Sequence, residues 1–343
     1  MEIAGFQLFA ILGFLFAAYA VVANDSIQTL GTFLASNSHR PWWLLWIYAG
    51  GIMVAALAHA YFFQDGDIAD GKLNSLPYPE NGIQWWHALP PLVLLFLTRF
   101  SIPVSTTFLV LTVFALSGGA ETEGVMQSML IKSALGYVVA FAAGGLIYAA
   151  VSRSWEKWVS DTRTERASGA WVVFQWSTTA FLWWTWLKQD FANIFVFLPR
   201  TDVAADGASV ALFDPLTIVL GGLVLLVMQA YIFATRGGEI QSIVLSKTNT
   251  TDVRAATFVD LIYAVVLYIF KEQSDIPMST TWVFLGLLAG RELAIAYVAS
   301  LRERREAALD VGTDAGRALI GLVISVALAI GMPWAATGQL PNF

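Results

Sequence analysis

Two short polar clusters interrupt otherwise apolar stretches, and each combines one aspartate with side-chain amides. They read Asn24-Asp25-Ser26-Ile27-Gln28 and Gln189-Asp190-Phe191-Ala192-Asn193. An isolated carboxylate in an apolar environment needs a cation, a proton or a polar partner to compensate its charge. Carboxylate and amide oxygens are hard ligands that suit an alkali cation, although the aspartates could carry protons instead. We therefore expect cation binding at Asn24, Asp25, Gln28, Gln189, Asp190 and Asn193, with Na⁺ or H⁺ at the two aspartates.

A second motif occurs twice in nearly the same form, as residues 102–107 (IPVSTT) and 276–281 (IPMSTT). Proline suits the first turn of a helix, and Ser or Thr hydroxyls cap the free backbone donors there. A helix start of this kind attracts anions through its N–H groups and dipole. One copy would be an ordinary cap, but the repeat favours a binding role. The predicted receptor for a small oxyanion comprises Ser105, Thr106, Thr107, Ser279, Thr280 and Thr281.

Other ionisable residues lie close to these motifs or within the same apolar segments. Arg99 and Lys271 precede the two prolines by a few residues, where they could attract the anion or extend toward the membrane surface. Asp260 is expected to pair with Arg254 or Arg291. These charges are therefore interpreted as anion-attracting or charge-compensating.

The composition is that of a membrane protein. The chain has 343 residues, of which 57% are hydrophobic and 13% charged, and apolar runs long enough to span a bilayer recur throughout. We expect an all-α polytopic membrane protein. There is no cysteine, and the three histidines lack ligand-like spacing. Without a nucleophile–base pair or a Gly-rich phosphate loop, the sequence predicts neither an enzyme nor a nucleotide-driven pump, and no cofactor or nucleic-acid partner.

The duplicated motifs divide the chain into two halves that we expect to be inverted repeats. The first repeat is 1–151, with a broken helix at 5–36 and a re-entrant hairpin at 84–118. The second is 168–343, with a broken helix at 168–198 and a hairpin at 254–301, and 152–167 is a linker. Tracing the apolar runs places the two hairpins open toward opposite sides of the membrane. The acidic clusters of both halves are then expected to meet at one central site.

Basic residues concentrate on one predicted side of the membrane. Twelve of them lie in segments 37–41, 152–167, 236–254 and 302–317, whereas the opposite segments hold only Lys72 and Arg200. By the positive-inside rule the linker is cytoplasmic. The sequence thus predicts a multi-pass protein of the cell (inner) membrane with both termini outside.

The two motifs together resemble those of the inorganic phosphate transporter (PiT) family. Each half of that family carries a Gly-Ala-Asn-Asp-x-x-Asn signature and a Pro-x-Ser-x-Thr-His hairpin. Here glutamine replaces one asparagine in each signature, and Phe108 and Trp282 stand where the family has histidine. The resemblance implies hairpins and broken helices within a scaffold, and symport of phosphate with Na⁺ or H⁺. Sulfate permeases share this pattern.

The leading hypothesis is secondary active symport of inorganic phosphate. Phosphate near neutral pH keeps an O–H that an aspartate could accept, whereas sulfate does not. A permease for sulfate or another small oxyanion is the alternative, and a passive anion channel, which would not need paired carboxylates, is less favoured. A homodimer is also expected, with spans 42–63 and 211–235 as the contact, where Gly50-Gly51 and Gly221-Gly222 permit close helix approach.

Overall fold

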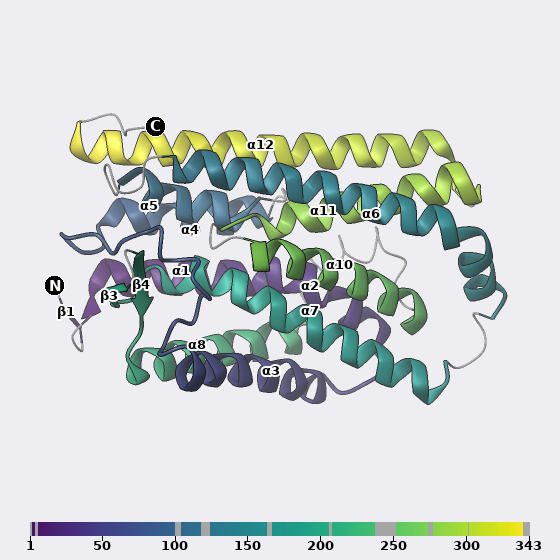
Figure 1. Ribbon diagram of the computed structural model, residues 1–343, viewed down its shortest axis with the longest axis horizontal. Helices are drawn as coiled ribbons and strands as arrows, with labels where there is room; N and C mark the ends of the chain where they lie inside the picture. The colour runs from purple at the N-terminus through teal and green to yellow at the C-terminus, as the bar shows by residue number, and fades with distance from the viewer. Residues whose placement is uncertain are drawn as a thin grey trace.

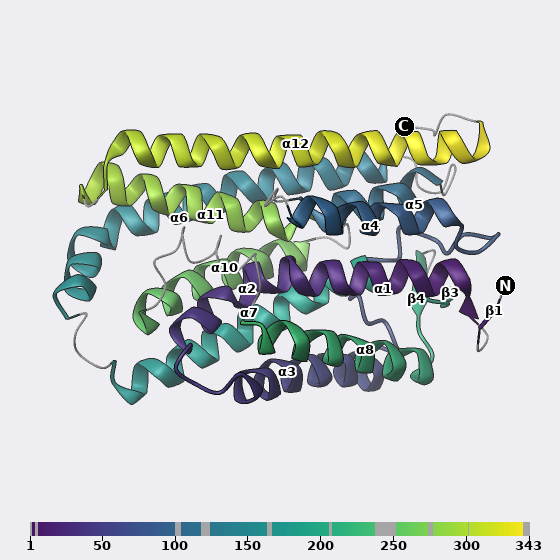
Figure 2. The same ribbon diagram turned by 180° about the vertical axis from the view of Figure 1, so that it is seen from behind.

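The computed structural model shows long helices lying side by side (Figures 1 and 2). It describes residues 2–3, 6–99, 104–117, 124–162, 167–205, 208–236, 252–273, 277–300 and 302–338. Within these residues, seven helical segments are long and apolar enough to cross a membrane. They are Leu8–Ser36, Trp42–Phe63, Val125–Ala150, Pro215–Ala234, Val253–Phe270, Thr280–Val298 and Arg304–Ala336. The protein is therefore an all-α polytopic membrane protein.

The first half contains the helix break that the sequence predicts. Its elements are α1 Leu8–Ala23, α2 Asp25–Ser36, α3 Trp42–Phe63, α4 Trp85–Arg99, η1 Thr107–Leu111, α5 Thr112–Ser117 and α6 Val125–Asp161, preceded by the short strands β1 Glu2–Ile3 and β2 Phe6–Gln7. Asn24 separates α1 from α2 with backbone angles φ −105° and ψ −69°. Because both angles depart from their α-helical values, φ more than ψ, the helix is interrupted there. Asp25 consequently stands at the start of a new helix.

The second half departs from the prediction at the corresponding point. Its elements are α7 Gly169–Phe195, β3 Thr201–Ala205, β4 Ala208–Leu212, α8 Pro215–Ala234, α10 Val253–Gln273, α11 Thr280–Ala294, η3 Ile295–Ala299 and α12 Arg304–Thr337. The predicted break near Asp190 is wrong, because α7 runs without interruption from Gly169 to Phe195. The polar cluster of this half therefore occupies the last turns of a continuous helix.

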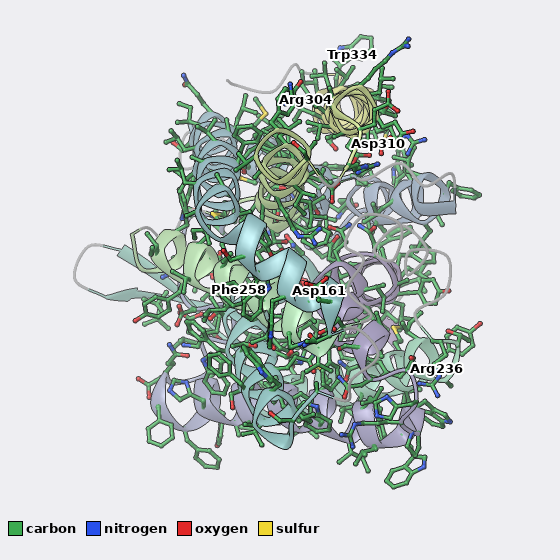
Figure 3. All side chains as sticks on the ribbon, turned by 90° about the vertical axis from the view of Figure 1, so that its right-hand side faces the viewer. Asp161, Arg236, Phe258, Arg304, Asp310 and Trp334 are labelled. Atoms are coloured by element: carbon green, nitrogen blue, oxygen red, sulfur yellow. The ribbon has the colours of Figure 1, made fainter. Side chains whose placement is uncertain are left out.

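Corresponding helices of the two halves run in opposite directions (Figures 1 and 2): α1–α2 against α7, α3 against α8, and α6 against α12. The helix contacts also correspond between the halves. α4 packs on α1 as α10 packs on α7, each within its own half. α11 lies along α6 as α5 lies along α12, each against a helix of the other half. The start of α1 and the end of α12 share one end of the molecule. The opposite end holds the C-terminal end of α6 and the start of α7. Figure 3 is viewed onto this end, with Asp161, Arg236 and Arg304 labelled.

Glycines set the closest helix contacts. A Cβ on Gly290 would lie 2.1 Å from the Phe141 carbonyl oxygen, so α11 and α6 approach backbone to backbone. Two of the glycines that we assigned to a dimer contact pack between α3 and α8: a Cβ on Gly50 would meet Leu226, and one on Gly222 would meet Leu57, whereas Gly51 has open space around it. α3 and α8 therefore use their small residues to pack on each other.

Candidate functional site

The first acidic cluster is organised by hydrogen bonds around the helix break. Asn24 Nδ2 donates to Asp25 Oδ1 at 2.6 Å, and Gln28 Nε2 donates to Asn24 Oδ1 at 3.2 Å. Asp25 lies in the first turn of α2, where the helix dipole favours a negative charge. The two amides thus fix the orientation of the carboxylate without using its second oxygen.

The second acidic cluster is held by bonds within α7. Asn193 Nδ2 donates to Asp190 Oδ1 at 2.8 Å, one helical turn away. The neighbouring Lys188 turns away from Asp190 and forms an ion pair of 3.0 Å with Asp70. A polar cluster in an apolar segment does not require an unwound backbone when its side chains pair along the helix, which explains why the predicted break is absent.

The two Ser-Thr-Thr segments begin helices, as their sequence predicts. Ser279 caps α11 by accepting a hydrogen bond from the Trp282 N–H at 3.2 Å. Ser105 accepts in the same way from the Phe108 N–H, also at 3.2 Å. Ser133 of α6, which sequence reasoning missed, accepts a bond from the Ser279 N–H at 2.8 Å. The two hairpin tips are thereby fixed as N-terminal helix ends within the protein interior.

The threonines of each tip contact the acidic cluster of the other half. Thr281 Oγ1 donates to Asp25 Oδ1 at 3.5 Å, and Asn193 Nδ2 donates to Thr107 Oγ1 at 3.3 Å. Thr107 Oγ1 in turn donates to the Met278 carbonyl at 3.2 Å, which joins the two tips. Asp25 and Asp190 are near enough for their carboxylates to repel each other when both are ionised. The structure thus gathers residues of both halves into one central cluster.

We call the predicted residues of both motifs the central cluster, in which Gln189 is included as the neighbour of Asp190 on α7. All of them are buried: Asn24, Asp25, Gln28, Ser105, Thr106, Thr107, Gln189, Asp190, Asn193, Ser279, Thr280 and Thr281. Six of its buried polar atoms have no hydrogen-bond partner among the described residues: Asp25 Oδ2, Asp190 Oδ2, Gln189 Oε1 and Nε2, Asn193 Oδ1 and Thr106 Oγ1. Buried polar atoms are rarely left unpaired unless something else binds them. Most of these atoms are oxygens, which suits a cation.

Some expectations about charges are not met, and a second residue was missed. Asp260 pairs with neither predicted arginine: Arg254 binds Asp252 at 2.6 Å, and Arg291 binds its neighbour Glu292. Tyr263 of α10 donates to the Thr280 carbonyl at 3.0 Å, and no sequence pattern marked this tyrosine. The side chains of Arg99 and Lys271, at the ends of α4 and α10, lie outside what the structure describes.

The fold is similar to that of a protein whose structure has been solved. A solved structure titled "The sodium-dependent phosphate transporter" is similar over 97% of this chain and 98% of its own, with a TM-score of 0.59 and 15% identity. This likeness shows that the two proteins share an overall fold. No family model and no curated protein matches the sequence.

Proposed function

We propose that the chain is a secondary active symporter that moves inorganic phosphate together with Na⁺. The observation that carries this proposal is the arrangement of unpaired buried oxygens on Asp25, Asp190 and Asn193 beside two helix N-termini. Helix starts and hydroxyls bind an anion, while carboxylate and amide oxygens bind an alkali cation. One enclosed cluster therefore offers ligands for both.

Charge explains why the two ions would travel together. A phosphate that enters beside Asp25 and Asp190 meets two like charges, each costing about 4 kcal/mol at about 4 Å in a medium of dielectric constant near 20. Cations on the two carboxylates remove that repulsion and add attraction to the anion. Coupling then follows from electrostatics, because neither ion binds well alone. A passive channel would have no use for this pair of carboxylates.

The transported anion and the coupling ion each have one alternative. Sulfate is the second substrate, since it has the charge of a small oxyanion but lacks the O–H that an aspartate oxygen accepts. Protons are the second coupling ion, because protonated carboxylates would also relieve the repulsion. We favour Na⁺ because side-chain amide and hydroxyl oxygens accompany both aspartates, and these oxygens suit a metal cation.

Alternating access would use the opposed hairpins. The α4–α5 hairpin opens toward the end where α1 starts, and the α10–α11 hairpin opens toward the end where α6 finishes (Figure 1). Displacing one hairpin would expose the central cluster to one side only. We further propose that the α6–α7 end is cytoplasmic, that both termini are outside, and that a second copy packs against the α3–α8 face.

Uptake into proteoliposomes tests this function. Purified protein would be offered labelled phosphate or labelled sulfate under an inward Na⁺ gradient or an inward H⁺ gradient. We expect phosphate accumulation driven by Na⁺, and none with the Asp25→Asn variant. The matched control is Glu306→Gln, which removes an exposed carboxylate in the first turn of α12, outside the cluster. Accumulation of neither anion under either gradient would refute the proposal.

A further inference from the structure

One buried carboxylate outside the central cluster has no part in the function proposed above. Asp260 of α10 is fully buried, and each of its oxygens accepts a hydroxyl hydrogen bond. Thr32 of α2 donates to Oδ1 at 2.5 Å, and Thr179 of α7 donates to Oδ2 at 2.6 Å. These two bonds tie the first helix of the second hairpin to a helix of each half.

The environment of Asp260 contains hydroxyls, whereas no described lysine or arginine forms an ion pair with it. Tyr48 of α3 interacts with its charge. The other described ionisable residues on α10 and on the helices packed against it are Asp25 of α2; Lys188 and Asp190 of α7; Lys132, Tyr137, Tyr148 and Asp161 of α6; Arg291 and Glu292 of α11; and Arg254, Tyr263 and Tyr268 of α10 itself. Among the cations, Lys188, Arg254 and Arg291 are engaged with other carboxylates.

Helical spacing connects Asp260 to the central cluster. Thr32 follows Asp25 by seven residues, close to two turns, so both lie on one face of α2 about 10 Å apart along its axis. Thr179 precedes Asp190 by eleven residues, close to three turns, on one face of α7. α2 extends from the break toward the α6–α7 end of the molecule (Figure 1). Asp260 therefore lies between the cluster and that end.

We propose that Asp260 is a proton-binding site, separate from the central cluster, whose protonation is coupled to movement of the α10–α11 hairpin. This inference rests on the proposed function, because the hairpin is taken to move during transport. In the closed arrangement, which is the one in the structure with α10 packed against α2 and α7, Thr32 and Thr179 stabilise the ionised carboxylate. When α10 moves away from α2 and α7, both donors are lost. A carboxylate that has lost both donors then takes a proton from water at the α6–α7 end and releases it on closing.

Infrared difference spectroscopy on the purified full-length protein tests proton binding without requiring transport. A pH titration is recorded for the wild type, for Asp260→Asn and for Asp25→Asn. We expect a carboxylic-acid carbonyl band that titrates in the wild type and in Asp25→Asn but is missing from Asp260→Asn. Thr179→Val removes one donor and should move the midpoint of this band to higher pH, whereas Thr179→Ser should leave it in place.

Two spectroscopic results would overturn the inference. One is a set of titrating bands that is the same in the wild type and in Asp260→Asn. The other is a band that Na⁺ removes at constant pH, because Asp260 would then bind the metal cation. If Asp260→Asn does not fold, the Thr179→Val and Thr179→Ser pair decides: equal midpoints in both variants contradict the proposal.

A transport assay tests whether protonation of Asp260 is coupled to transport. Phosphate uptake under a fixed Na⁺ gradient is measured over a range of pH on the α6–α7 side, and Asp260→Asn should keep uptake but lose the pH dependence of the wild type. An unchanged pH profile would overturn the coupling. Absence of any wild-type uptake would refute the proposed function instead, while the infrared titration would still decide whether Asp260 binds a proton.

Discussion

Thr281 and Asp25 are 256 residues apart in the chain, yet the hydroxyl of one donates to the carboxylate of the other at 3.5 Å. Thr107 and Asn193 form the reverse connection, from the first hairpin to the second acidic cluster, at 3.3 Å. Each hairpin tip is thus bound to the acidic cluster of the opposite half. Moving either hairpin must break a contact with the other half, so the two halves cannot act independently.

Neutralising either aspartate is expected to remove cation coupling. Asp25→Asn and Asp190→Asn keep the size of the side chain and delete one charge, which is worth about 4 kcal/mol at about 4 Å and a dielectric constant near 20. Na⁺ affinity should fall at least about a hundredfold by that estimate. Isothermal titration of Na⁺ measures it, and Glu306→Gln should bind Na⁺ like the wild type. Wild-type affinity in both aspartate variants would exclude them as ligands.

Removing a threonine hydroxyl at a hairpin tip should weaken anion binding. Thr106→Val deletes a buried hydroxyl that has no hydrogen-bond partner among the described residues, and a hydrogen bond to a charged group contributes about 1.5–3 kcal/mol. We expect KM for phosphate to rise roughly tenfold to a hundredfold in this variant. Thr313→Val is the control, because Thr313 bonds its own helix at the Leu309 carbonyl on the exposed surface of α12. Equal KM values for Thr106→Val and Thr313→Val would contradict a role in anion binding.

The contact between α6 and α11 should not tolerate a side chain at Gly290. An added Cβ would lie 2.1 Å from the Phe141 carbonyl oxygen and 2.7 Å from the Gly145 nitrogen. Gly290→Ala is expected to destabilise the protein by about 1–3 kcal/mol through overpacking. Thermal unfolding in detergent measures the change. Gly316→Ala in α12 has open space around it and should be neutral or slightly stabilising.

The Lys188–Asp70 ion pair links the segment that follows α3 to α7, two residues before Asp190. Its side chains are 11% and 15% exposed, and Gln64 also donates to Asp70 at 2.6 Å. Lys188→Gln and Asp70→Asn should each lower thermal stability. The double variant should lose less than the sum of the two, with a coupling energy of about 1 kcal/mol. Strictly additive losses would mean that the pair contributes no interaction energy.

The sequence predicts local features of this molecule well and long-range partners poorly. The break at Asn24 and the capping serines depend on residues within one turn, so their patterns were sufficient. The break expected at Asp190 was wrong because Asn193, one turn along, pairs with it inside an intact helix. Asp260 was misassigned to nearby arginines because its true partner Thr32 lies 228 residues away. No spacing rule reports a contact at that separation.

Binding of labelled phosphate to the purified protein shows whether one cluster binds anion and cation together. Phosphate affinity is measured at several Na⁺ concentrations, and Na⁺ affinity at several phosphate concentrations. Thermodynamic linkage requires the two ligands to strengthen each other by the same factor. We predict this mutual enhancement in the wild type and its loss in Asp25→Asn and Asp190→Asn. Phosphate binding that is independent of Na⁺ in the wild type, or enhancement that survives both substitutions, would contradict it.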